Sequence, residues 1–115
     1  MFFMKSLFQK IIDKKEPAKI LYEDSSYMII DNKYPKAPIH WLIIPKKHIA
    51  SISSAREADK EILGGLLLLA KKFARKKKIK DYKLVFNCGK HQHIPHLHLH
   101  FLAGKLREFT TRGKL

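Results

Sequence analysis

The sequence has few of the features that would point to a secreted, disulfide-bonded or membrane-spanning protein. It has a single cysteine, Cys88, so no internal disulfide can form, and a reducing compartment is the simplest expectation. No apolar run approaches the roughly 20 residues that cross a bilayer, and no signal-peptide cleavage site follows the short apolar start. We therefore expect a cytoplasmic protein that does not enter a membrane.

Acidic residues are also scarce, because ten Asp and Glu stand against 24 Lys and Arg, a formal net charge of +14. Such a charge favours anionic partners, among them nucleotides, nucleic acid and acidic surfaces. The lysines are spread along the chain, however, and a solvated lysine-rich surface explains them without a partner. One dense group (Lys71, Lys72 and residues 75–78) lies at the end of a predicted helix, where cations complement the helix dipole. Nucleic acid is therefore an open but not a favoured partner.

The chain has 115 residues, 45% of them hydrophobic, and neither repeats nor a low-complexity linker, so one domain over residues 1–115 is expected. Helical periodicity predicts a short helix over 5–13 and a long helix from a capping box at Ser54 and Glu57 to about residue 78. Short β-rich segments predict strands at 19–23, 26–31, 40–45, 82–87 and 96–102. This order of elements favours an antiparallel sheet with helices beside it, an α+β fold.

Three histidines alternate with apolar residues in the segment His96-Leu97-His98-Leu99-His100-Phe101-Leu102. Successive side chains of a strand point to opposite faces, so the three imidazoles are predicted to share one face while the apolar residues fill the core. Imidazole can act as a nucleophile and as a proton donor near neutral pH. Two other interpretations stay open: a zinc site, which has no cysteine pair or nearby carboxylate to complete it, and an exposed histidine-rich face.

The same segment resembles the His-φ-His-φ-His-φ-φ signature of the histidine triad (HIT) superfamily, in which φ is an apolar residue. Three further segments resemble the Hint branch of that superfamily: Lys15–Ile20, Ala37–His48 and Val85–Asn87. Their order and spacing agree from about Leu7 to Gly104. The resemblance implies a HIT-like fold, an antiparallel sheet of about five strands with one long and one short helix. Residues 1–6 would then form an N-terminal extension, and residues 105–115 a C-terminal tail.

The resemblance further implies a nucleotide hydrolase that needs neither metal nor cofactor and commonly forms a twofold homodimer through the long helix and the C-terminal region. His98 would attack the α-phosphorus of a nucleoside 5′-phosphoramidate or a related AMP conjugate, form a nucleotidyl-histidine and release the nucleotide to water. His100 would contact the phosphate oxygens and the leaving group, and His96 and His40 would form a supporting pair.

The resemblance places a second set of residues around a purine nucleotide: Asn87 near the phosphate, Asp31 at the ribose hydroxyls, and Leu7, Phe8, Ile11 and Ile30 at the base. A carboxylate can hold a ribose diol, and apolar walls accept a base. Each residue also has a plainer explanation, since Phe8 and Ile11 fit a core and Asn87 and Asp31 fit turns.

The loop before the three histidines departs from the family pattern. Many Hint proteins carry Gly-Gln-Ser there, with a serine that assists the leaving group, whereas this shorter loop keeps Gln92 and has His93 in place of the serine. Both residues are expected beside the substrate, and His93 could still donate a proton to a leaving amine. The alternatives for the whole protein are a dinucleoside polyphosphate hydrolase, an enzyme that removes AMP from nucleic-acid ends, and a nucleotide-binding protein with little turnover.

Overall fold

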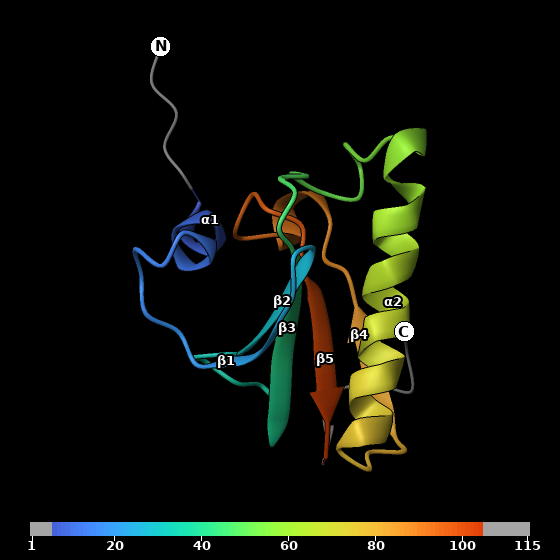
Figure 1. Ribbon diagram of the computed structural model, residues 1–115. Coiled ribbons are helices and arrows are strands. Elements are labelled where there is room, and N and C mark those ends of the chain that lie inside the picture. The colour runs from blue at the N-terminus through green and yellow to red at the C-terminus, as the bar shows by residue number, and fades with distance from the viewer. Residues whose placement is uncertain (1–5, 105–115) are drawn as a thin grey trace.

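The computed structural model of the protein describes residues 6–104 (Figure 1). Its elements are α1 (Leu7–Ile12), β1 (Ile20–Glu23), β2 (Tyr27–Asp31), β3 (Ile39–Pro45), the 3-10 turn η1 (Glu57–Asp59), α2 (Lys60–Lys76), β4 (Tyr82–Val85), the 3-10 turn η2 (Gly89–His91) and β5 (Leu99–Ala103). The strands form one antiparallel sheet in the order β1-β2-β3-β5-β4. The predicted α+β fold, with five antiparallel strands, one long helix and one short helix, is confirmed.

The sheet lies between the two helices, with α1 on one side and α2 on the other (Figure 1). The strands β2, β3 and β5 are therefore buried on both faces, and their alternate side chains fill two separate clusters. The cluster on the α2 side consists of Ile29, Trp41, Ile43, Ile49, Leu66, Ala70, Phe73, Ala74, Leu97, Leu99, Phe101 and Ala103. The cluster on the α1 side consists of Phe8, Ile11, Met28, Ile30, Leu42 and Ile44.

The short helix α1 begins at a capping residue that the sequence assigned to an extension. The hydroxyl of Ser6 accepts a hydrogen bond from the Gln9 main-chain N–H at 3.1 Å, so this residue is part of the helix boundary. Phe8 and Ile11 are the buried residues of α1, and they hold the helix against the sheet. The rest of the expected extension and the expected tail lie outside the described residues.

The predicted start of the long helix is wrong. Ser54 does not cap a helix with Glu57, because its hydroxyl and main-chain N–H bond Ser51 in a turn. The helix α2 begins at Lys60, directly after the 3-10 turn η1, whose start is capped by the buried Asp59: its carboxylate accepts the Arg56 main-chain N–H at 2.9 Å and the Lys47 ammonium at 2.7 Å. The contact with Lys47 is tertiary, so a local capping pattern could not reveal it.

The last strand begins later than predicted, at Leu99 and not at His96. The main chain before it is bonded outside the sheet ladder, since the His96 N–H donates to the Ile94 carbonyl at 2.8 Å and the Leu97 N–H to the Ile49 carbonyl at 2.7 Å. His96 therefore lies in a bend before the strand, and its side chain does not follow the alternation of β5. The other part of the prediction is confirmed, because Leu97, Leu99 and Phe101 are buried in the core cluster on the α2 side.

Candidate active site

His98 and His100 lie next to each other on the α1 side of the sheet. Their ring centroids are 5.0 Å apart, and the ring of Phe8 from α1 packs edge-on against His98 at 4.8 Å. His98 is buried, and His100 is half-buried. The structure thus brings two of the predicted catalytic imidazoles together beneath α1, at the start of β5.

The hydrogen bonds of His98 define which of its ring nitrogens can react. Its Nδ1 lies 2.7 Å from the main-chain carbonyl oxygen of His96, and a carbonyl can only accept, so Nδ1 carries the hydrogen. The neutral ring then has its lone pair on Nε2. Burial lowers the pKa of His98 below its usual value, and the charge of His93 lowers it further against the opposing effect of the His96 carbonyl. His98 is therefore a neutral imidazole at pH 7 with Nε2 as its basic atom.

A chain of hydrogen bonds defines the tautomers of His40 and His100 in the same way. The main-chain N–H of Lys36 donates to His40 Nδ1 at 3.0 Å, which leaves the hydrogen of a neutral His40 on Nε2. His40 Nε2 lies 2.9 Å from His100 Nδ1 and donates to it. His100 then carries its own hydrogen on Nε2. The Asn87 side-chain nitrogen lies 3.2 Å from this atom and is also a donor, so the amide pairs with this tautomer only when its oxygen is turned toward Nε2. A main-chain group thus makes His100 a donor at the nitrogen that faces away from His40.

The electrostatics keep these two rings uncharged. Burial lowers the pKa of His100 to about 4, with further contributions from the charges of His98, His40 and Lys36. Burial also lowers the pKa of His40, helped by Lys36, while Asp31 partly offsets the shift. Both rings therefore stay neutral, and each accepts a hydrogen bond at Nδ1 and carries its hydrogen on Nε2. His100 can thus donate its Nε2–H to an anion.

His96 contacts partners other than His40, with which it was expected to form a supporting pair. His96 Nε2 donates to the main-chain carbonyl oxygen of Pro45 at 2.8 Å, and its Nδ1 lies 3.4 Å from His48 Nδ1. Burial lowers the pKa of His96, so it too is neutral at pH 7. The bend that precedes β5 turns this ring away from His40. Its observed role is to anchor the segment whose carbonyl orients His98.

The two polar residues expected around the nucleotide lie in different surroundings. Asn87 lies two residues after the end of β4 and contacts His100, so the structure brings it to the histidine site. Asp31 ends β2 and is half-exposed, and its carboxylate lies 4.0 Å from the Lys19 ammonium. Its carboxylate raises the pKa of His40, which places it within electrostatic range of the same site.

The apolar residues expected at the base share one neighbourhood. Phe8, Ile11 and Ile30 are all buried in the cluster on the α1 side, and Phe8 connects that cluster to His98. Leu7 differs from them, because 43% of its surface is exposed. The plainer explanation of Phe8 and Ile11 as core residues is therefore confirmed, and contact of these side chains with a base stays a prediction.

The shortened loop is held in place by Gln92. The side-chain nitrogen of Gln92 donates to the Ala50 carbonyl at 2.6 Å and to the Ile94 carbonyl at 2.8 Å. Ile94 in turn packs against the cluster on the α1 side. His93 lies between these two anchored residues, is exposed, and is close enough for its charge to lower the pKa of His98. The loop therefore keeps His93 within electrostatic range of His98, while the amide hydrogens of Gln92 are used within the fold.

Two participants in the site could not be identified from the sequence pattern. The Lys36 main-chain N–H sets the His40 tautomer, and no side-chain motif marks a main-chain donor. Asn32, whose amide nitrogen lies 3.2 Å from His40 Nε2, follows the strand end of β2 and looked like an ordinary loop residue. Within residues 6–104, no three His, Cys, Asp or Glu side chains are grouped to hold a metal ion, and no helix is long and apolar enough to span a membrane.

The fold and the site together define an α+β protein with neutral histidines lined up on one face of an antiparallel sheet. A family model described as "Scavenger mRNA decapping enzyme C-term binding" matches residues 5–112. A relative from Buchnera aphidicola subsp. Baizongia pistaciae, named an uncharacterized HIT-like protein, is 43% identical over 104 residues, 87% of this chain and 93% of the relative.

Solved structures agree with this match. The HIT family hydrolase from Legionella pneumophila is similar with a TM-score of 0.82 and 40% identity, over 88% of this chain and 94% of that one. The HIT family hydrolase from Clostridium thermocellum has a TM-score of 0.83 and 39% identity, over 90% and 94% of the two chains. The chain belongs to the histidine triad (HIT) family, and the resemblance to that superfamily inferred from its motifs is confirmed.

Proposed function

We propose that the protein is a nucleotide hydrolase that cleaves nucleoside 5′-phosphoramidates or related AMP conjugates at the α-phosphorus. Family membership supports a nucleotide-binding or nucleotide-hydrolysing protein in general. The observation that carries the finer proposal is the pair of fixed tautomers in the site. His98 presents a lone pair on Nε2, while the adjacent His100 presents an N–H. A nucleophile and an anion-binding donor thus stand side by side.

In the first step, His98 Nε2 attacks the α-phosphorus and the phosphorus–nitrogen bond to the leaving amine breaks. The electron pair of that bond goes to the amine, which takes up a proton, and a nucleotidyl-histidine remains. In the second step, water attacks the phosphorus, the bond to His98 breaks, and the nucleoside monophosphate leaves. The His98 hydrogen bond to the His96 carbonyl stabilises the positive charge that its ring acquires on attack.

The surrounding residues have supporting roles in this proposal. His100 and Asn87 donate to the phosphoryl oxygens, where negative charge increases in the transition state. Asp31 accepts from the ribose hydroxyls, and Leu7, with the edge of the Phe8 and Ile11 cluster, contacts the purine. His93 stands where it can reach the leaving amine. Gln92 supports that role by holding the loop rather than by touching the nucleotide.

The decisive experiment compares wild type with His98→Asn on adenosine phosphoramidate, a diadenosine polyphosphate and adenylylated DNA. Loss of the nucleophile should lower kcat by on the order of 10⁴ or more, because no other group can form the covalent intermediate. Asparagine keeps a side-chain donor for the His96 carbonyl, so folding should be unaffected. Turnover that survives the substitution would contradict the nucleophile assignment. Faster hydrolysis of the diadenosine polyphosphate or of the adenylylated DNA than of the phosphoramidate would assign the protein to that substrate class instead.

We also propose that two copies form a homodimer in the cytoplasm, through the middle of α2. Leu67 and Leu68 are 44% and 59% exposed there, and a side-chain carbon at Gly64 would meet no atom within 4 Å. A second helix could approach closely at this point and cover both leucines. Sedimentation should show a dimer that Leu68→Lys dissociates. A monomeric wild type at micromolar concentration would contradict this proposal.

A further inference from the structure

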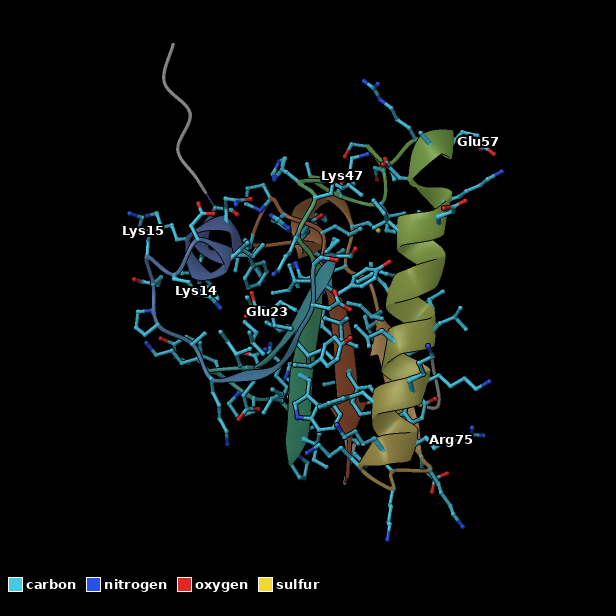
Figure 2. All side chains as sticks on the ribbon, in the orientation of Figure 1. Lys14, Lys15, Glu23, Lys47, Glu57 and Arg75 are labelled. Carbon is cyan, nitrogen blue, oxygen red and sulfur yellow. The ribbon has the colours of Figure 1, made fainter. Side chains whose placement is uncertain are left out.

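The segment that follows β3 contains a histidine to which the proposed hydrolysis assigns no role. His48 lies three residues after the end of β3, and its side chain is exposed. Figure 2 shows the neighbouring Lys47 on the connection from β3 to α2, at the same end of the sheet as Glu57. Exposure alone would make His48 an ordinary surface residue, so its contacts decide whether it does more.

His48 contacts the buried ring of His96. The two ring centroids lie 5.1 Å apart with the planes at 77°, and the two Nδ1 atoms are 3.4 Å apart. His96 donates its Nε2–H to the Pro45 carbonyl, so its neutral ring has the lone pair on Nδ1. The hydrogen between the two Nδ1 atoms therefore belongs to His48, which donates it. A charged His48 ring also carries this hydrogen, so the contact survives protonation of His48.

The hydrogen bond from His48 satisfies an atom that water does not reach. The residue His96 is fully buried, and a buried acceptor without a donor loses its hydration and gains nothing in return. Within residues 6–104, every buried side-chain nitrogen and oxygen has a hydrogen-bond partner. His48 thus supplies the second of the two hydrogen bonds that hold the His96 ring, the first being that to the Pro45 carbonyl.

The same segment also holds the main chain that follows His96, and we call residues 45–50 the brace. The carbonyl of Ile49 accepts the Leu97 N–H at 2.7 Å. That N–H belongs to the same planar peptide group as the His96 carbonyl, which accepts the Nδ1–H of His98 at 2.7 Å. The brace therefore orients both the ring of His96 and the carbonyl that sets the tautomer of the proposed nucleophile.

Ion pairs anchor the brace on two sides. Lys46 pairs with Glu23 of β1 at 2.7 Å, and Lys47 pairs with Asp59 of η1 at 2.7 Å. The brace is thus tied to β1 on one side and to the start of α2 on the other. His48 directly follows Lys47, so its main chain is held close to the buried ring that it contacts. Such a fixed side chain is suited to positioning another group.

We propose that His48 is a positioning residue for the nucleophile: it holds the ring of His96, and the His96 carbonyl holds the Nδ1 hydrogen of His98. The role of His98 rests on the proposed function, whereas the contacts that connect it to His48 do not. A misplacement of about 1 Å in a reacting group can cost on the order of 100-fold in rate. His48 therefore raises kcat without touching the substrate, because it keeps the lone pair of His98 in one place.

The first test compares hydrolysis of adenosine phosphoramidate by wild type, His48→Leu and His48→Asn. Leucine removes the donor, so kcat per folded molecule should fall roughly 10-fold to 100-fold while KM changes by less than about twofold. Asparagine places an amide N–H near the position of Nδ1 and should recover most of the loss. The matched control is the exposed His91→Leu, which should keep the wild-type kcat. An unchanged kcat in His48→Leu, or an equal loss in both His48 variants, would overturn the proposal.

The second test needs no substrate, so it can fail separately from the proposed function. NMR of the ring nitrogens reports which of them carries the hydrogen. The wild type should show hydrogen on Nε2 of His96 and on Nδ1 of His98. His48→Leu should show mixed tautomers for His98 with an unchanged circular dichroism spectrum, and His48→Asn should restore the single tautomer. A single, unchanged His98 tautomer in His48→Leu would refute the role of His48. If the wild type does not hydrolyse phosphoramidates, the proposed function fails and this spectrum alone decides that role.

Discussion

The two faces of the sheet are built from the same strands but differ in chemistry. On the α2 side, β3 and β5 contribute Trp41, Ile43, Leu99 and Phe101, and the cluster is entirely apolar. On the α1 side, the alternate residues of the same two strands include His40 and His100, which are connected to each other by a hydrogen bond. Alternation along a strand thus lets one segment contribute to stability with one face and to chemistry with the other.

The α1 face buries titratable rings, which need hydrogen-bond partners. Four imidazoles, those of His40, His96, His98 and His100, have a lowered pKa there, because burial disfavours their charged forms. Each one is held by hydrogen bonds to the main chain or to another histidine. The α2 face needs no such partners. We therefore expect substitutions on the two faces to have separable effects on folding and on catalysis.

The largest effect on stability is expected on the α2 face, from Phe101→Ala. The ring is fully buried and stacks between Trp41 and Tyr82, with centroids 4.7 Å from each. Its removal should lower the free energy of unfolding by about 3–5 kcal/mol, measured by urea denaturation. The control is Tyr34→Ala, which removes a ring that is 74% exposed and should change it by less than about 0.5 kcal/mol. A loss of kcat per folded molecule would show that the faces are not separable.

A smaller effect, on catalysis rather than on folding, is expected from His40. Replacing it by Leu removes the donor that sets the His100 tautomer, and kcat should fall roughly 100-fold. His40→Gln can still donate an amide N–H to His100 Nδ1 and should recover part of that loss. Equal activity of the two variants would mean that the ring of His40 only fills space. Circular dichroism should show both variants folded.

A separate effect is a dependence of stability on pH that arises from the histidines of the α1 face. The four histidines bind protons in the unfolded chain near pH 6.5 but not in the folded one, so stability is full above that pH and falls as the pH drops. Each histidine can lower the free energy of unfolding by up to about 1.4 kcal/mol per pH unit. For His100 this loss ends near its folded pKa of about 4.

Urea denaturation between about pH 7 and pH 5 measures this dependence, above the range of the carboxylates. Glu23, Asp24 and Asp59 also have a lowered pKa, but their contribution is lost only at lower pH. His100→Asn should flatten the slope, whereas the exposed His91→Gln should leave it unchanged. A flat profile for the wild type would contradict the neutral state of the four rings.

Local patterns predicted the elements well and their ends less well. The strands at 26–31 and 40–45 were predicted within a residue, because β-rich runs and turn residues such as Asp24 mark them locally. The start of α2 was misplaced because the 3-10 turn η1 precedes it, and η1 is held by Asp59 through the Arg56 main-chain N–H and through an ion pair with Lys47, a contact between distant elements. The start of β5 was misplaced because the Leu97 N–H bonds Ile49 outside the ladder.

The sequence by itself determined the family, the α+β architecture and the gathering of His98 and His100 on one face, because periodicity and motif spacing are properties of the chain alone. Only the tertiary structure decided which histidine contacts which. It joined His40 to His100 and left His96 to the Pro45 carbonyl. The reason is physical: a buried imidazole takes the tautomer that its neighbours permit, and those neighbours here are main-chain groups that the fold brings from other segments.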